Sequence, residues 1–547
     1  GINLKNVMLT PEDKSSSSVS ASEVEVGVTL SSLLAGTLEI KSVRAIGVET
    51  SIIQTDEANK NVPKPRTDEE LEAHYANRKA ELETGTAGEG LPPIPLNLEV
   101  GSLEIRNAQV SLINPQANTS QIINLEELSV RNLNTRGDPA SVSVLMLVSG
   151  ETDIEVDIQT ETAIDLSKGI VSFTDLYLEI IGATPNPLSI SAAGEVDLAR
   201  EIAKLDIEVG TDVIKANGSV TRNAYESPEI DMVLSINLID PAMLVSSEGQ
   251  SSSQKSASST DTSSEATNTL DNPLPVDPLR DLDIRAQLEI AKVSIGPNIL
   301  NNVGASLRIF EGMLTLSEVA GEFNGGFLSL ETQLNAKYNK ASFSAEGGLE
   351  GLNFDQLAAS YGAPDLLSGT GGVSLALSSE GTTPRELIRN LKGPVNVKTS
   401  AVTLQRINLE KTMCQGIALV NKKLLSSSFP NKTEFASLNA DLRFADGSAK
   451  IGPFSADLAS LKLDGAGLLN LESSDFTLGL ESTILQSIGE LDPACVLDSK
   501  YTNLTWPVNC EGNLMEDSSE WCKVDTAEVL AQFAKETVKE EAKKKAK

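Results

Sequence analysis

Cysteine and histidine have the most chemically versatile side chains in this chain, and both are rare. The cysteines are Cys414, Cys495, Cys510 and Cys522, and the only histidine is His74. The last three cysteines are separated by 15 and 12 residues, which does not fit the paired C-x-x-C pattern of a zinc site, and His74 lies far away in a helix-like segment. The sequence therefore predicts no metal site.

Disulfide bonds are the chemistry that these cysteines favour. All four are disulfide candidates, and two bridges formed in an oxidising compartment are a better interpretation than buried free thiols. Four cysteines allow three connectivities, among which the sequence does not choose, although the stretch from Pro493 to Cys510 resembles a hairpin that Cys495 and Cys510 could tie. Reduction should then cost this region roughly 2 to 5 kcal/mol per native bridge.

Other catalytic arrangements are missing from the sequence. One histidine leaves no Ser/His/Asp or Cys/His triad and no H-E-x-x-H motif, and no G-x-x-x-x-G-K-[ST] loop is present. Gly369–Gly372 is glycine-rich, but it leads into the alternating pattern of Val373–Leu377, so it predicts a turn and not a phosphate site. Acidic residues are frequent, yet nothing marks a pair as a glycosidase pair. We expect no enzymatic activity, no catalytic residues and no cofactor.

Composition and charge narrow the class of protein. The 547 residues carry 44 Lys and Arg against 77 Asp and Glu, a formal charge of −33, which argues against a nucleic-acid partner. Aromatic residues are only 4%, and the 40% hydrophobic content is mainly aliphatic. A chain of this length without large core residues is typical of an extended sheet with one solvated face.

A repeated strand unit predicts the architecture. Leu307–Leu334 aligns without a gap to Leu442–Leu469, and in both an acid-Gly pair separates alternating segments (Glu311-Gly312 and Asp446-Gly447). Such a pair is a strong hairpin signal because glycine readily adopts positive φ. Looser copies occur at Gly36–Ile53 and Gly101–Ile113. We predict a mainly β fold: a long, curved, antiparallel sheet with a few short helices.

Alternation along these strands also predicts a functional surface. Alternate residues of a strand face the same side, so aliphatic side chains should line one face as a trough without fixed polar anchors, and such a surface suits acyl chains. Within a strand this agreement is firmer than between strands, because a bulge resets the phase. The candidates for this lipid groove are Leu103, Ile105, Val110, Leu112, Leu314, Leu316, Leu328 and Leu330.

Insertions and helices divide the chain. We expect an N-terminal β part at residues 1–245 with a helical insert at about 63–90, a disordered Ser/Thr-rich loop within 246–280, and a C-terminal β part at 281–524. Short helices are expected at about 383–392 and 409–425. Residues 525–547 read as a Lys-rich helix, whose lysines complement the helix dipole or, alternatively, face a membrane. No stretch is long and apolar enough to span a bilayer.

Several short motifs together resemble one protein family. GTGGVSLALSSEGTTPRELIRNLKGPVNVKTSAVTLQRINLEK (Gly369–Lys411), the strands from Leu442, and then DPAC, WPVNCEG and WC are similar to the C-terminal half of the AsmA family of bacterial envelope proteins. LSSLLAGTLEIKSVRAIGVE (Leu30–Glu49) and GSLEIRNAQVSL (Gly101–Leu112) are similar to its opening region. The resemblance implies a repeating β-groove related in architecture to TamB-like and bridge-like lipid transfer proteins.

The same resemblance implies a location and partners. A family member would sit in the periplasm, anchored to the bacterial inner membrane by an N-terminal helix that this chain lacks, and would carry phospholipid acyl chains along its groove to support outer-membrane lipid homeostasis. The alternative is a scaffold or assembly factor for outer-membrane proteins without lipid conduction, which would bind a partner protein at its strand edges. A periplasmic hydrolase would need a catalytic cluster that the sequence does not contain.

Overall fold

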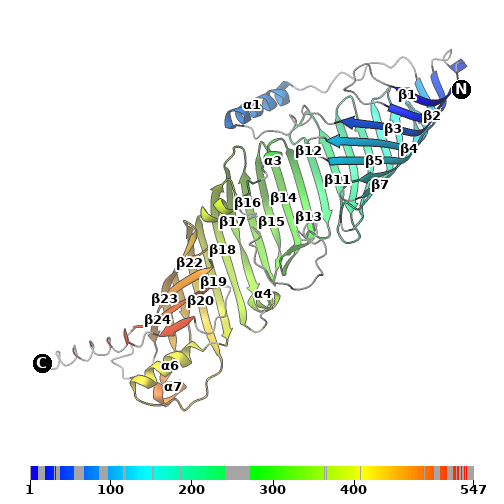
Figure 1. Ribbon diagram of the computed structural model, residues 1–547. Helices are drawn as coiled ribbons and strands as arrows, with labels where there is room; N and C mark the ends of the chain where they lie inside the picture. The colour runs from blue at the N-terminus through cyan, green and yellow to red at the C-terminus, as the bar shows by residue number, and fades with distance from the viewer. Residues whose placement is uncertain are drawn as a thin grey trace. The chain divides into compact units, whose positions relative to one another are not determined.

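A computed structural model gives the structure of the chain (Figure 1). It describes residues 2–9, 19–53, 67–84, 97–240, 272–497, 505–513 and 521–538, with short gaps at 30, 33–36, 115–118, 151–152, 185, 275, 363, 365, 407 and 486 and within 525–537. The chain forms two compact units: unit 1 comprises residues 1–257, 281–292 and 306–311, and unit 2 comprises 258–280, 293–305 and 312–547.

Unit 1 is built from strands that pair with their neighbours in sequence. The strands are β1 (Ile2–Leu9), β2 (Val19–Thr29), β3 (Thr37–Ile53), β4 (Asn97–Asn114), β5 (Thr119–Asn134), β6 (Arg136–Ser149), β7 (Ile154–Asp165), β8 (Ile170–Ile181), β9 (Leu188–Asp197), β10 (Ile202–Gly210), β11 (Lys215–Asn223) and β12 (Ile230–Ile236). β13 (Asp283–Ile295) and β14 (Asn298–Phe310) supply residues to both units. In Figure 1 the strands of unit 1 follow one another from blue to cyan.

Strand direction differs from the expectation at two places. The expected sheet was antiparallel throughout, but β3 pairs with β4 and β12 pairs with β13 in parallel, which makes the sheet mixed. A parallel pair needs a crossover of a dozen or more residues, whereas a hairpin needs two. The two crossovers are the segments that carry the helical insert and the Ser/Thr-rich sequence, so the insertions in this chain coincide with its parallel pairs.

Unit 2 continues the same architecture with more helices. Its strands are β15 (Met313–Phe323), β16 (Gly326–Asn335), β17 (Ala341–Asn353), β18 (Leu367–Gly381), β19 (Gly393–Gln405), β20 (Lys432–Ala445), β21 (Ser448–Asp457), β22 (Leu461–Asn470), β23 (Asp475–Ile484), β24 (Thr505–Asn513) and β25 (Cys522–Val524). The strand pairs from β15 to β25 are antiparallel. Its helices are α3 (Asp277–Arg280), α4 (Phe354–Ser360), α5 (Pro384–Arg389), α6 (Leu409–Val420), α7 (Ile488–Leu491) and the 3₁₀ helix η4 (Pro493–Cys495).

The two copies of the repeated unit have the same local geometry. Glu311 and Gly312 adopt φ of 47° and 74°, and Asp446 and Gly447 adopt 50° and 73°. Positive φ at both central residues is the requirement of a type I′ hairpin turn, so the acid-Gly prediction is confirmed. Both copies also shift register after the turn, between Leu316 and Val319 in one and at the equivalent positions, Ile451 and Phe454, in the other.

Three helices, α1 (Asp68–Thr84), α5 and α6, begin where the sequence predicts a helix. The insert forms α1, and Thr67 and Glu70 make the expected capping box: the Thr67 N–H donates to Glu70 Oε2 at 2.8 Å and the Glu70 N–H donates to Thr67 Oγ1 at 3.3 Å. These bonds from Thr67 lower the pKa of the Glu70 carboxyl. His74 of α1 lies 2.9 Å from Asp281 Oδ1. The helix predicted at 409–425 is shorter in the structure, where α6 ends at Val420.

Two predictions fall largely outside the described residues. The Ser/Thr-rich loop is described only from residue 272, and the Lys-rich segment 525–547 is described only at isolated positions up to 538. Both remain predictions, as does the division of the chain at residues 245 and 281. Within the described part of the chain, no helix is long and apolar enough to cross a membrane.

Candidate functional site

The apolar face of the strands is the candidate functional surface in unit 1. Residues paired across neighbouring strands point to the same side of a sheet, so the register identifies rows of side chains that share a face. One row from β3 to β13 is entirely aliphatic: Ala45, Ile105, Leu128, Val144, Ile158, Leu178, Ile190, Val209, Ala216, Ile236 and Ile290. Its members from Ala45 to Ile236 are all half-buried, so they are still accessible.

The neighbouring row in unit 1 has the opposite character. It consists of Arg44, Glu104, Ser129, Ser143, Gln159, Tyr177, Ser191, Glu208, Asn217, Ser235 and Glu289. Ion pairs form on this polar face. Arg44 lies 3.4 Å from Glu104, and the Arg285 guanidinium donates two hydrogen bonds to the Asp231 carboxylate, at 3.0 Å and 2.5 Å. The hydrogen bonds from Arg285 lower the pKa of the Asp231 carboxyl. Of these two neighbouring rows, only the polar one therefore contains charged residues.

A bulge brings the four unit 1 candidates to the same face. Leu103 and Ile105 have odd numbers, whereas Val110 and Leu112 have even numbers, so strict alternation would separate them. Asn107 adopts φ of 53°, and the pairing of β4 with β5 skips Asn107 and Glu126 together without a register shift. β5 is instead shifted by one residue against β6, between Leu125 and Glu127. A bulge of one residue inverts the alternation. Leu103 and Ile105 consequently share a face with Val110 and Leu112.

The unit 2 candidates are arranged in the same way. Leu314 pairs with Leu334, Leu316 with Thr332, Val319 with Leu330 and Gly321 with Leu328. Glu318, at φ of 54°, forms the bulge that separates the first two pairs from the last two. Leu314, Leu316, Leu328 and Leu330 therefore share one face of β15 and β16, as the alternation predicted. Whether this face binds lipid is a separate question.

The row of paired residues through Leu328 extends across unit 2 and is apolar throughout. Its members from β16 to β24 are Leu328, Leu349, Val373, Val397, Ala440, Phe454, Gly465, Leu480 and Val508. The adjacent row on the opposite face begins with Ser329, Gly348, Ser374, Asn396 and Asp441. The members up to Val397 are half-buried, whereas Ala440, Leu480 and Val508 are buried.

A buried hydrophobic cluster explains that change along the row. Met413 and Ile417 of α6 pack with Trp506 of β24 and with residues of the apolar face, and Trp506 is only 1% exposed. A Cβ atom at Gly416 would lie 3.2 Å from the indole ring, which shows how closely α6 approaches. Here the apolar face is filled by side chains of the protein itself. The sequence predicted a helix here but gave no sign that it would cover the sheet.

The disulfide bonds hold this covered end together. Cys414 of α6 is bonded to Cys495 of η4, and Cys510 of β24 is bonded to Cys522 of β25. The suggestion that Cys495 and Cys510 close a hairpin is therefore wrong. Cys414 and Cys495 are fully buried, whereas Cys522 is exposed. The cross-links thus attach α6 to a segment 81 residues further along the chain and β25 to its neighbouring strand.

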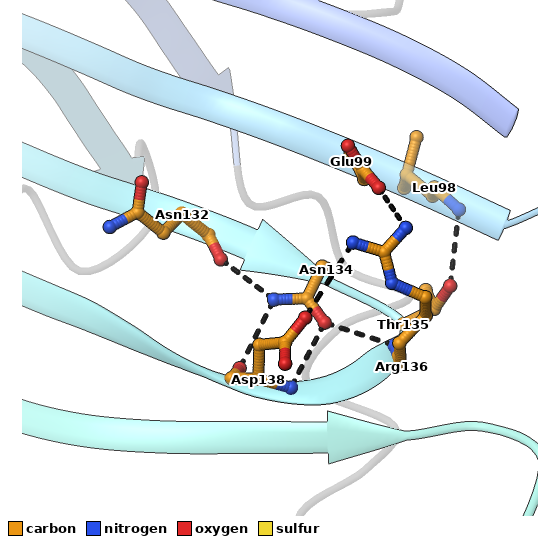
Figure 2. Close-up of polar contacts among 7 residues, drawn as sticks. All are labelled: Leu98, Glu99, Asn132, Asn134, Thr135, Arg136 and Asp138. Carbon is orange, nitrogen blue, oxygen red and sulfur yellow. Dashed lines mark hydrogen bonds and ion pairs between the residues drawn. The ribbon is translucent and has the colours of Figure 1, made fainter. Parts of the chain in front are cut away.

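The connection between β5 and β6 is held by the buried side-chain amide of Asn134, a residue that was not identified from the sequence. Figure 2 shows Asn134 at the end of β5, where its Nδ2 donates to the carbonyls of Asn132 (3.0 Å) and Asp138 (3.1 Å). Its Oδ1 accepts from the N–H groups of Arg136 (3.0 Å) and Asp138 (3.1 Å). Nearby, Thr135 Oγ1 accepts from the Leu98 N–H at 3.1 Å, which ties the connection to β4. Asn134 has a structural role.

The polar face offers no comparable candidate. An open hollow of about 700 Å³ lies over β8 to β12 and includes Asp175, Asp206 and Glu208 among its lining residues. Within the described ranges, no group of three or more His, Cys, Asp or Glu side chains is placed to hold a metal ion. In each unit, the aliphatic rows are therefore the better candidate for a functional surface among the described residues.

Comparison with known proteins finds a similarity over part of the chain. The sequence model of the AsmA family matches residues 197–454, just under half of the chain. This part of the chain is therefore similar to the AsmA family. A similar curated protein is Protein AsmA of Escherichia coli (strain K12), which is 24% identical over 163 residues. That match covers 29% of this chain and 26% of the relative, so the chain spans about a quarter of the length of the relative it matches.

Proposed function

We propose that this AsmA-like protein binds phospholipid acyl chains along the aliphatic face of its strands and carries them within the bacterial cell envelope. The observation that carries the proposal is the aliphatic row from β3 to β12, whose members are all half-buried. An accessible apolar surface of this extent is a binding surface for an apolar ligand, because water contact there is unfavourable.

The arrangement of charge supports a ligand held by its hydrocarbon part. The aliphatic rows contain no charged residue, and the ion pairs described above lie on the opposite face. Each methylene group that leaves water contributes about 0.8 kcal/mol before the cost of ordering the chain. Affinity should therefore depend on acyl-chain length and only weakly on the head group.

The family and the disulfides support a location in the envelope. Disulfides form in oxidising compartments such as the periplasm, and both bridges of this chain are in unit 2. The protein would act in the periplasm, attached to the inner membrane, and would support outer-membrane lipid homeostasis. It would act without catalysis, with phospholipids and envelope proteins as partners.

Matched substitutions on the two faces of one strand test the proposal. Leu328→Lys puts a charge on the aliphatic face of β16, and Ser329→Lys puts the same charge on the opposite face one residue away. Ile158→Lys and Gln159→Lys form the equivalent pair on β7. Native mass spectrometry should detect co-purified phospholipid, and vesicle-to-vesicle assays should detect transfer, in the wild type and in both polar-face variants.

The aliphatic-face variants should lose occupancy and transfer while keeping the circular dichroism spectrum of the wild type. Folded Leu328→Lys and Ile158→Lys proteins that bind and transfer lipid normally would refute the proposal. Wild-type protein without bound lipid in any preparation would do the same.

A scaffold for the assembly of outer-membrane proteins is the second candidate. It is favoured by the covered end of unit 2, where α6 and Trp506 fill the apolar face with protein side chains. A scaffold would keep its activity in Leu328→Lys, since a partner strand would bind at a strand edge and not on the aliphatic face. Loss of lipid transfer in this variant together with normal assembly of outer-membrane proteins would separate the two roles.

A further inference from the structure

The turn that follows α6 exposes aliphatic side chains to an unusual extent. Leu424 is 93% exposed and Leu419, in the last turn of the helix, is 73% exposed. Val496, directly after η4, is 56% exposed. We call these three residues, together with the exposed Lys422 and Lys423, the α6 tip. Soluble proteins do expose single leucines, but a cluster of exposed aliphatic side chains indicates a binding partner.

Hydrogen bonds place the members of the α6 tip next to one another. The Asn421 side chain, which follows the last residue of α6, donates to the carbonyls of Ala494 at 2.9 Å and Val496 at 3.0 Å. The segment after η4 therefore lies against the C-terminal end of α6. Figure 1 shows α6 and α7 side by side in unit 2. The exposed aliphatic residues of both segments consequently belong to one surface.

The α6 tip is held by a rigid framework. The Asp492 carboxylate is buried and accepts from the N–H groups of Ser426 (2.7 Å), Ser427 (2.5 Å) and Ala494 (2.7 Å). The Cys414–Cys495 bond joins α6 to η4. Beyond the end of the helix, Lys422 adopts φ of 53°, and the Lys423 N–H donates to the Ala418 carbonyl at 2.9 Å. Leu424 is thus presented by a fixed turn.

The charge of the α6 tip is opposite to that of the chain. Lys422 and Lys423 are adjacent and exposed in a protein whose formal charge is −33. Lysines near a helix C-terminus complement the helix dipole, which accounts for the charges alone. The dipole gives no reason for exposed leucines on both sides of these lysines. Aliphatic side chains next to lysines are the combination that inserts into a bilayer interface with anionic head groups.

We propose that the α6 tip docks on the surface of an anionic lipid bilayer, with Leu419, Leu424 and Val496 entering the interface and Lys422 and Lys423 contacting lipid phosphates. Met413 and Ile417 on the buried side of the same helix pack on the covered end of the aliphatic face. Docking would hold this end of unit 2 at a membrane. The contact uses residues outside the aliphatic rows, so it does not depend on the proposed binding of acyl chains.

Vesicle co-sedimentation tests the docking surface. Wild-type protein should sediment with vesicles of phosphatidylglycerol and phosphatidylcholine and much less with phosphatidylcholine alone. Replacing both lysines (Lys422→Gln with Lys423→Gln) should weaken partitioning roughly 30-fold, since each lysine contributes about a factor of five near an anionic surface. Leu424→Gln should weaken binding to the same vesicles about tenfold.

Matched controls come from β22 and its neighbour. Leu468→Gln changes another exposed leucine, and Lys450→Gln with Lys462→Gln removes two exposed lysines, all outside the α6 tip. These controls should bind like the wild type, and native mass spectrometry should show unchanged lipid occupancy in the α6 tip variants. Equal sedimentation of wild type and tip variants, or an equal loss in the control variants, would overturn the proposal. So would equal binding to neutral vesicles.

Discussion

The two disulfides should contribute unequally to the stability of unit 2, and the difference can be calculated from the chain lengths that they close. Cys414 and Cys495 are 81 residues apart, whereas Cys510 and Cys522 are 12 residues apart. The loss of loop entropy in the unfolded chain corresponds to about 4.5 kcal/mol for the longer loop and about 2.8 kcal/mol for the shorter one. Removal of the longer cross-link should therefore cost more.

The disulfide that contributes less to stability should be reduced first, because it is the more accessible one. Cys522 is exposed, whereas Cys414 and Cys495 are fully buried under α6. Mild reductant followed by alkylation should first label Cys510 and Cys522 in the folded protein. The buried pair should be labelled only when unit 2 unfolds. Peptide mapping by mass spectrometry would identify both the pairing and the order.

Tryptophan fluorescence gives a local measure of unfolding. The chain contains two tryptophans, and both lie in unit 2. Trp506 belongs to the buried cluster, and the ring centroid of Trp521 lies 5.1 Å from that of Phe476. Denaturant titrations should show a larger loss of stability for Cys414→Ala with Cys495→Ala than for Cys510→Ala with Cys522→Ala. The reasoning fails if the order is reversed, or if mapping finds Cys495 bonded to Cys510.

Four further substitutions have defined outcomes. Asn134→Ala removes the amide that satisfies the β5–β6 connection, so it should destabilise unit 1 by about 2 kcal/mol and speed hydrogen exchange at that turn. Hydrogen bonds from the backbone N–H groups of Ala494, Ser427 and Ser426 hold the pKa of Asp492 well below its usual range, so the folded protein stabilises the charged carboxylate. The contribution of the charged Asp492 to stability is full above pH ~5 and falls on acidification, because the unfolded chain then binds the proton first. Thermal unfolding should therefore show the difference in stability between wild type and Asp492→Asn becoming smaller as the pH falls. A difference that does not depend on pH would exclude this account. Gly312→Ala and Gly447→Ala impose similar strain at φ of 74° and 73°, but a Cβ at Gly312 would lie 2.9 Å from Lys337 Cα, whereas the nearest atom at Gly447 is 3.8 Å away. Gly447→Ala should therefore cost about 1 kcal/mol and Gly312→Ala more, and equal losses in denaturant titrations would contradict this packing difference.

Local features of this protein could be predicted from its sequence because each depends on a few neighbouring residues. The acid-Gly turns at Glu311-Gly312 and Asp446-Gly447 follow from the freedom of glycine at positive φ. The start of α1 follows from the reciprocal bonds between Thr67 and Glu70. Alternation along β15 and β16 likewise placed Leu314 and Leu316 on one face, since a strand has a period of two.

The tertiary structure decided what depends on residues far apart in the chain. Alternation alone assigned no phase across Asn107, and only the register of β4 with β5 and of β5 with β6 shows that Ile105 and Val110 share a face. The pairing of Cys414 with Cys495 joins residues that nothing in their spacing connects. The packing of α6 on the apolar face likewise depends on which elements meet in space, and it determines where that face is open and where the protein covers it itself.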